Sequence, residues 1–385
     1  MLRFLDAGES HGPGIVTVVE GMPYGVPVSG KAIEAELARR RLGYGRGARM
    51  ELEGDEVEVL GGVRGGRTLG SPVAMLVRNA EYEKWRETMP VEGEVMARPL
   101  TAPRPGHADL AGALKYGTHD VRDVLERSSA RETVGRVCAG ALAKALLACF
   151  DMRLYSHVLR IGTVAVPEER GLPAEREVAK ADGDPVRCLD GEISLRMREE
   201  VDRAREEGDS LGGVFEVIAF RVPPGLGSHV HWDRRLDARL AAAIMGIQAI
   251  KGVEIGDGFR LAGMRGSAAA DAIDHSPGRG FHRLSNHGGG LEGGISNGEP
   301  LVVRAAMKPI PTLRRPLASV DLVSKERVDA AVERADVCAV PAAAVVAESA
   351  VALVLADALM EKLGGDSLEE MEARFRDLLE RQRAF

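Results

Sequence analysis

Apolar residues recur at two different spacings along the chain, and the spacing separates expected strands from expected helices. Alternating or β-branched runs predict strands over residues 2–5, 14–20, 56–63, 72–79, 155–166, 214–222 and 301–307. Runs with helical spacing predict helices over residues 30–42, 134–149, 195–207, 234–250, 325–333, 342–363 and 367–383. Because strand pairs lie close together between the helices, we expect an α/β protein with α+β-type layers rather than a doubly wound parallel sheet.

The glycine-rich segment 286–297 does not change this fold prediction. Gly288, Gly290 and Gly293 match a dinucleotide-binding fingerprint by letter, but no β-branched strand precedes them and the residues that follow prevent a helix. We therefore reject a Rossmann site, and expect these glycines to let the backbone approach a flat ligand. No low-complexity linker and no exact repeat divides the 385 residues, so we expect one domain over 1–385.

Composition and charge narrow the class of protein. A formal net charge of −7 argues against nucleic-acid and membrane-surface binding, and it makes any arginine cluster conspicuous. The most apolar run, 337–347, is broken by Glu348 and is too short to span a bilayer. The N-terminus has no signal pattern, and none of the four cysteines has the CxxC spacing of a zinc site. We expect a cytoplasmic protein.

The stretch 101–133 concentrates charged groups that a buried core rarely accepts. Prolines and a glycine fix the backbone ahead of His107, and Ser129 followed by Glu132 is the capping-box pattern. Arg127 and the two serines after it would then precede a helix N-terminus, where backbone N–H groups favour an anion. The alternative is an ordinary capped helix with a solvated, charged approach loop.

A second basic cluster lies at residues 39–49. Five arginines and three glycines occur there, and arginine binds phosphate and carboxylate groups in bidentate fashion. The dipole of the preceding helix alone would explain the presence of the three arginines at 39–41, because cations are favourable at a helix C-terminus. It does not explain Arg46 and Arg49, which lie beyond the glycines.

Two histidine motifs remain. His11 in the turn GESHG does not fit a nucleophile elbow, so it is either a lone acid exposed on a loop or a structural residue. His229, His231 and Asp233 resemble a facial metal triad. All three lie within five residues and no second ligand cluster accompanies them, so we expect no metal.

Taken together, the motifs resemble those of the chorismate synthase family. They occur in family order over most of the chain: GESHG at 8–12, RRRLGYGRGARM at 39–50, RPGHAD at 104–109, RSSARET at 127–133, GDSLGG at 208–213, GSHVHWDRRLD at 227–237, QAIKGVEIG at 248–256, GGISNG at 293–298, KPI at 308–310 and RADVCAVPAA at 334–343.

The resemblance implies a β-α-β sandwich, a homotetramer and reduced FMN as cofactor. It implies a lyase that converts 5-enolpyruvylshikimate 3-phosphate to chorismate by anti-1,4-elimination of phosphate, the last step of the shikimate pathway. In the family, reduced flavin is thought to lend electron density to the carbon that loses phosphate, and its N5 to take the ring proton. Whether the protein reduces its own FMN with NADPH or relies on an external reductant stays open.

The resemblance also implies roles for individual residues. The catalytic residues would be His11 near the departing phosphate, His107 beside the flavin pyrimidine ring and Asp336 near flavin N5. The substrate-binding residues would be Ser10, Arg40, Arg46, Arg49, Arg104, Arg131 and Arg334. The FMN contacts would be Arg127, Ser128, Ser129, Ala130, Gln248, Ala249, Gly293, Lys308, Pro309, Ile310, Pro311, Thr312 and Arg334.

Three positions depart from the family pattern: Pro311, Ala335 and the pair His287-Gly288. Pro311 removes one possible phosphate donor. Two rival readings remain, a non-catalytic anion-binding scaffold and a metal hydrolase centred on His229 and His231. Flavin binding without metal dependence would argue against both.

Overall fold

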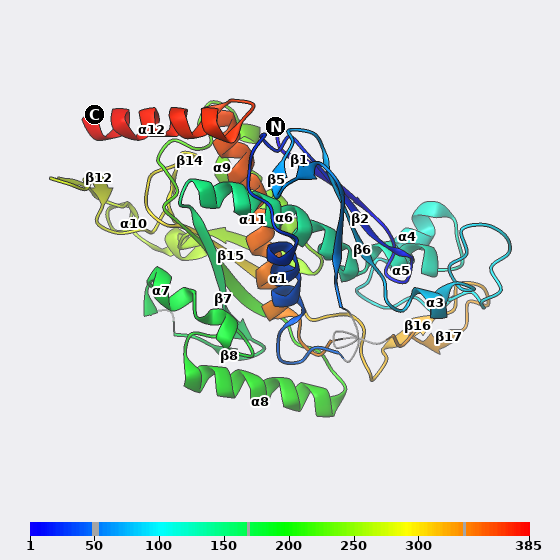
Figure 1. Cartoon of the computed structure of the whole chain (residues 1–385). Coiled ribbons are helices and arrows are strands. Elements are labelled where there is room, and N and C mark those ends of the chain that lie inside the picture. Colours follow the sequence, from blue (N-terminus) through cyan, green and yellow to red (C-terminus); the bar gives the residue numbers. More distant parts are fainter. Residues whose placement is uncertain (48–53, 168–169, 334–335) are drawn as a thin grey trace.

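Two antiparallel sheets face each other across a layer of helices in the computed structural model (Figure 1). The structure describes residues 1–47, 54–167, 170–333 and 336–385. The first sheet has the order β1-β2-β6-β3, with strands Arg3–Ala7, Gly14–Glu20, Val73–Arg78 and Val57–Gly61. The second has the order β10-β15-β9-β7-β8, with strands Ile250–Ile255, Leu301–Met307, Gly213–Phe220, Arg153–Ile161 and Val164–Ala165.

The first sheet is buried on one face only. Along β2, Ile15, Thr17 and Val19 are buried, whereas Val16 and Val18 between them are exposed. The register places each buried residue opposite a buried residue of β6, for example Val19 opposite Val73. This alternation is the period-two pattern that the sequence displays, and it turns one face toward the helices.

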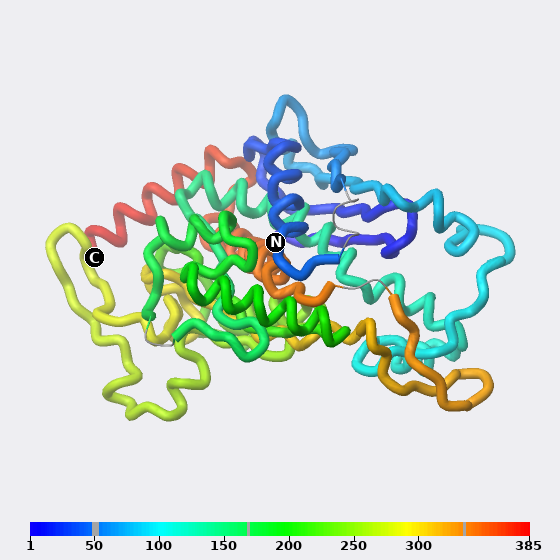
Figure 2. The backbone as a smooth tube through the Cα atoms, turned by 90° about the horizontal axis from the view of Figure 1, so that it is seen from below, coloured from blue at the N-terminus to red at the C-terminus, as the bar shows by residue number. Residues whose placement is uncertain are grey.

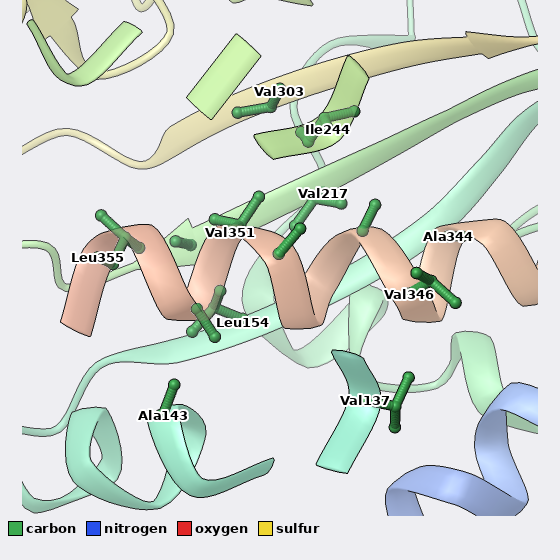
Figure 3. Close-up of a cluster of buried hydrophobic side chains, with 14 of the residues drawn as sticks. Val137, Ala143, Leu154, Val217, Ile244, Val303, Ala344, Val346, Val351 and Leu355 are labelled. Atoms are coloured by element: carbon green, nitrogen blue, oxygen red, sulfur yellow. The ribbon is translucent and has the colours of Figure 1, made fainter. Parts of the chain in front are cut away.

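Helix α11 (Val340–Leu363) lies at the centre of the helix layer (Figure 3). It packs on α6 (Thr133–Cys149), on α9 (Leu236–Met245), on α1 (Gly30–Arg41) and on the second sheet, while α6 also packs on β2. A Cβ atom added to Gly140 of α6 would lie 2.2 Å from the Cβ atom of Ser349 of α11. Glycine at that position therefore lets the two central helices approach closely.

The length of α11 corrects one expectation. The apolar run at 337–347 is too short to span a membrane, but from Val340 on it belongs to a 24-residue helix that is long and apolar enough to do so. Most of this helix is buried inside the protein, which explains its apolar character. It is the core helix of the fold.

Smaller elements complete the structure. The remaining strands are β4 (Val63–Arg64), β5 (Arg67–Thr68), β11 (Ile273–Ser276), β12 (Gly280–Arg283), β13 (Leu291–Glu292), β14 (Ile295–Ser296), β16 (Ala318–Val320) and β17 (Arg327–Asp329). Among the described residues, the remaining α-helices are α3 (Tyr82–Trp85), α4 (Asp109–Tyr116), α5 (Arg122–Ser128), α7 (Glu175–Val178), α8 (Gly191–Glu207), α10 (Gly266–Ala269) and α12 (Leu368–Ala384). The β11–β12 hairpin projects at one end of the molecule and the β16–β17 hairpin at the other (Figure 2).

The predicted fold class is confirmed. The strand pairs of both sheets are antiparallel among the described residues, and helices α6 and α11 lie between the sheets, as a β-α-β sandwich requires. The predicted helix over 325–333 is wrong, because Arg327–Asp329 pairs with Ala318–Val320 as a short hairpin. The predicted helix over 234–250 ends at Met245, and the chain turns there into β10.

The stretch 101–133 forms two short α-helices and a 3-10 helix rather than one charged loop before a helix. Arg127 and Ser128 form the last residues of α5, shortly before α6 begins at Thr133, and Ser128 Oγ donates to the carbonyl of Val124. Ser129 caps a short 3-10 helix (Ala130–Glu132) by accepting from the N–H of Arg131. Since the Glu132 side chain accepts from Gln248 and Arg136, the predicted capping box is wrong.

Candidate active site

A cavity of about 790 Å³ opens where the stretch 101–133 meets the start of α11 and the end of the second sheet. This volume lies in the range of small-molecule sites. Its walls come from the turn around Ser10, the end of α1, helix α3, the loop before α4, the α5–α6 junction, the turn at 247–249 and the segment 307–312. Segments far apart in sequence therefore converge on one site.

Most of the predicted site residues line this cavity. They are Ser10, His11, Arg40, Arg46, Arg104, His107, Ser128, Ser129, Ala130, Arg131, Gln248, Ala249, Lys308, Ile310, Pro311, Thr312 and Asp336. Arg49 and Arg334 lie outside the described residues. The cavity lining does not include Arg127, Pro309 or Gly293.

For Arg127 and Gly293, the contacts explain why the residue does not line the cavity. The side chain of Arg127 is 43% exposed, and it contacts Asp6 and the carbonyl of Gly8. Gly293 forms the turn between β13 and β14, where a Cβ atom would approach His229. Within one chain, neither residue reaches the cavity.

His11 is held from two sides. Its backbone N–H donates to Glu126 Oε2 at 2.8 Å, and its ring Nδ1 lies 2.9 Å from Glu126 Oε1. A carboxylate only accepts hydrogen bonds, so Nδ1 carries the proton and Nε2 is the nitrogen on the far side of the ring from Glu126. The indole of Trp85 stacks on the imidazole, with ring centroids 3.8 Å apart.

Asp109 organises a second group. It accepts from Arg104 through the backbone N–H at 3.0 Å and through Nε at 2.8 Å, and it also contacts His107 Nδ1. Burial alone would raise the pKa of the Asp109 carboxyl, but the hydrogen bonds from His107 and Arg104 hold the pKa well below its usual range. The fully buried carboxylate therefore fixes both cavity-lining side chains.

Two buried arginines form another part of the wall. Arg40 donates to Thr133 Oγ1 at 2.8 Å and to the carbonyl of Ala130 at 2.9 Å. Arg131 donates to Asp55 Oδ1 at 2.7 Å. Their guanidinium groups are held in fixed positions, as binding of an anion in a defined geometry requires.

Arg46 is also paired. Its NH1 lies 2.7 Å from Asp336 Oδ2, and the other oxygen of Asp336 accepts from the N–H of Gly47. Arg39, by contrast, binds Glu36, Asp182 and Glu348. The expectation that Arg39 has a structural explanation therefore fits its contacts, although the partners are ion pairs rather than the helix dipole alone.

The cavity wall around Gln248 contains a buried oxygen without a partner in the described part of the chain, an unusual backbone angle and a lysine with a lowered pKa. Gln248 Nε2 donates to Glu132, whereas its buried Oε1 has no hydrogen-bond partner among the described residues. Ala249 has a positive φ of 65°, which is unusual for a residue with a side chain. Burial lowers the pKa of Lys308, with a further contribution from Lys251.

Sequence reasoning missed several residues of the site. Trp85, Glu81, Lys84, Thr88 and Glu333 line the cavity, and Glu126 and Asp109 hold its histidines. Glu126 is separated from His11 by 115 positions, and no spacing rule connects them. For Asp109, the signal was its place two residues after His107 in the Pro-Gly turn.

The metal-like motif lies elsewhere. His229, His231 and Asp233 are exposed, and His231 Nδ1 pairs with Asp233 at 2.7 Å. None of the three lines the cavity. Over the described residues, no group of three or more His, Cys, Asp or Glu side chains is arranged to hold a metal ion.

Comparison with known proteins decides the family. The family model "Chorismate synthase" matches residues 2–360. The chain belongs to the chorismate synthase family. It is 57% identical to the chorismate synthase of Thermobifida fusca (strain YX), with 99% of each chain covered. It is 55% identical to that of Carboxydothermus hydrogenoformans, again with 99% of each chain covered.

A solved structure agrees in fold. A crystal structure of a chorismate synthase superposes with a TM-score of 0.81 at 43% sequence identity, covering 100% of this chain and 99% of the other. The activity is that of a chorismate synthase, a lyase of the shikimate pathway that serves aromatic amino acid biosynthesis. The two rival readings, a scaffold and a metal hydrolase, are set aside.

Proposed function

We propose that the cavity binds reduced FMN together with 5-enolpyruvylshikimate 3-phosphate, and that the lining residues release phosphate to give chorismate. The observation that carries this proposal is the gathering of Arg40, Arg46, Arg104 and Arg131 around one cavity in a chain of net charge −7. A substrate with one phosphate and two carboxylates requires such a concentration of cations.

The lining residues fit a flavin. The buried, unpartnered Oε1 of Gln248 is an acceptor that a ring N–H of the cofactor would satisfy. Ala342, Ala343 and Val346 of α11 supply an apolar wall for a planar ring. Lys308 and the backbone at 310–312 would hold the phosphate-bearing side of the cofactor. When bound, reduced flavin supplies electron density that eases loss of the phosphate.

The chain's own residues would position the substrate and move protons. The arginines bind its phosphate and carboxylates, with Ser10 beside them. His11, fixed by Glu126, is placed to donate a proton to the departing phosphate. His107 would stabilise the anionic cofactor, and Asp336, which bonds Arg46 and Gly47, would assist removal of the ring proton.

We also propose a cytoplasmic homotetramer, in keeping with the family. Gly293 lies outside the cavity of its own chain, so a contact between Gly293 and FMN would require a neighbouring copy. Size measurement by light scattering tests the assembly. Assays with FMN and NADPH alone, without dithionite, test whether the protein reduces its own cofactor.

The first prediction concerns the cofactor. The purified protein should release phosphate from 5-enolpyruvylshikimate 3-phosphate only when FMN is reduced, because the elimination needs the electron density of the reduced ring. Phosphate release is measured anaerobically with reduced FMN, with oxidised FMN, and with divalent metal and no flavin. Equal turnover with oxidised FMN, or with metal alone, would contradict the proposal.

The second prediction concerns substrate affinity. Arg46→Ala should weaken substrate binding roughly 10- to 150-fold, equivalent to about 1.5–3 kcal/mol, because a charge-assisted contact is lost and Asp336 is left facing an anion. Arg46→Lys should restore only part of the affinity, since an ammonium group lacks the planar fork. Substrate titrations with FMN present measure both effects.

Arg39→Ala and Arg78→Ala are the controls for Arg46. Arg39 lies in the last turn of α1, shortly before the loop that carries Arg46, but its side chain bonds Glu348. Arg78 pairs with Glu58 on the surface. We expect Arg39→Ala to lower stability rather than substrate affinity, and Arg78→Ala to change neither. If either control weakens substrate binding as much as Arg46→Ala, the arginines act as a diffuse field and not as a clamp.

A further inference from the structure

Glu126 is a buried carboxylate that contacts His11. Its residue is only 2% exposed, and its two oxygens accept from the backbone and from the ring of His11. The backbone carbonyl of Glu126 also accepts from the N–H of Ser10 at 3.0 Å. One residue of α5 therefore fixes both Ser10 and His11, although it does not line the cavity.

The charge on Glu126 is stabilised by its surroundings. Burial by itself would raise the pKa of Glu126, but the hydrogen bonds from His11 and the nearby Arg122 hold the pKa below its ordinary value. Arg122 NH1 lies 3.3 Å from Glu126 Oε1, and its NH2 lies 3.7 Å from Glu333. Glu126 thus remains an anion over the pH range in which histidine titrates.

Trp85 covers the other side of the imidazole. Its ring is tilted only 26° from that of His11, and the guanidinium of Arg122 lies 5.3 Å from the indole centroid. The face of an indole attracts a cation, so the stack favours the protonated imidazole over the neutral one. Among the described residues, Glu81 and Lys84 beside Trp85, together with Glu333, are further charged groups that line the cavity.

We propose that Glu126 and Trp85 are positioning residues that set the protonation of His11 and thereby the pH range over which the enzyme turns over. The inference rests on the proposed role of His11 as a proton donor. Glu126 places a negative charge beside the imidazole and fixes the orientation of the ring. Trp85 stacks on the ring, and the face of its indole attracts a positive charge. Without them, the imidazole loses its paired carboxylate and its fixed orientation, and activity should decline earlier as the pH rises.

The chain offers a direct reporter of this coupling. It has two tryptophans, Trp85 and the exposed Trp232. In a Trp232→Phe background the emission comes from Trp85 alone, and a protonated imidazole stacked on an indole quenches its fluorescence. We expect Trp85 emission to rise as His11 loses its proton, and we expect this step to vanish in His11→Asn.

The decisive variant is Glu126→Gln in the Trp232→Phe background. We expect it to move the fluorescence step to lower pH by about one to three units, the usual effect of a neighbouring opposite charge. Glu126→Asp, which retains the charge, should recover part of the shift. Glu216→Gln is the matched control, because Glu216 is equally buried and pairs with His157 at 3.0 Å in the second sheet. A step unchanged by Glu126→Gln would overturn the proposal.

The kinetic measurement completes the test. In full-length enzyme with reduced FMN, the alkaline limb of kcat/KM should move to lower pH in Glu126→Gln and, by a smaller amount, in Trp85→Leu, but not in Glu216→Gln. A uniform loss of activity with an unmoved limb would show a merely structural role and overturn the proposal. If His11→Asn remains fully active, the proposed proton-donor role of His11 is wrong. The fluorescence step would still show whether Glu126 acts on His11. Circular dichroism spectra confirm that each variant is folded.

Discussion

Replacing His11 by asparagine should lower kcat about 10²–10⁴-fold, the usual contribution of one positioned acid. Asparagine retains a polar side chain of similar reach, so the turn and its contact with Glu126 should survive. FMN affinity should change little, because the predicted flavin contacts come from other segments. Single-turnover phosphate release with reduced FMN measures the effect on chemistry, and a flavin titration measures binding.

The matched control for His11 is His157. Like His11 it pairs with a buried glutamate, but it lies in β7 of the second sheet, away from the cavity. His157→Asn should lower stability and leave kcat nearly unchanged. Near-normal turnover of His11→Asn would mean that His11 is a structural loop residue.

Replacing Glu348 by alanine should cost about 3–5 kcal/mol of unfolding free energy, the usual consequence of breaking a buried ion pair. Glu348 is fully buried in α11 and contacts Arg39, Lys144 and Arg187. Alanine would leave three cations together without their shared anion. Denaturant unfolding at fixed protein concentration measures the loss, with exposed Glu58→Gln as the control that should change stability little.

The same network predicts an acid-dependent loss of stability. Burial would raise the pKa of Glu348, but Lys144 and Arg39 hold it far below the ordinary glutamate range. A depressed carboxyl pKa contributes stability that is fully present above the unfolded-state value and disappears as the pH falls below it. Glu348→Gln should therefore flatten the decline of stability between neutral and acidic pH. An unchanged decline would show that other carboxylates dominate it.

The sheets and central helices were predictable because local patterns encode them. β2 alternates buried and exposed residues, and α6 repeats apolar residues at helical spacing. The segment 325–333 misled the prediction because Lys325, Glu326 and Arg327 are good helix formers, whereas its strand is fixed by pairing with Ala318–Val320. Tertiary contacts thus override propensity where an element is short.

The cavity residues were predictable in part for a different reason. Charged side chains in Pro-Gly and Gly-rich turns, such as Arg46 and His107, stand out against an acidic sequence, and the family motifs assign them to one site. Glu126 and Trp85 do not stand out, because their roles arise only when α3 and α5 fold against His11. Arg127 keeps its family motif, but within this chain its side chain contacts Asp6, and this contact cannot be predicted from local spacing.

The measurement that tests the account most directly is a crystal structure of the protein with FMN and 5-enolpyruvylshikimate 3-phosphate. We predict that both ligands occupy the one cavity, with the flavin ring against Ala342 and Ala343 of α11 and near Gln248. We predict that the substrate's anionic groups lie on Arg40, Arg46, Arg104 and Arg131, with His11 beside the phosphate. Either ligand bound outside this cavity, or a substrate phosphate remote from His11, would contradict the account.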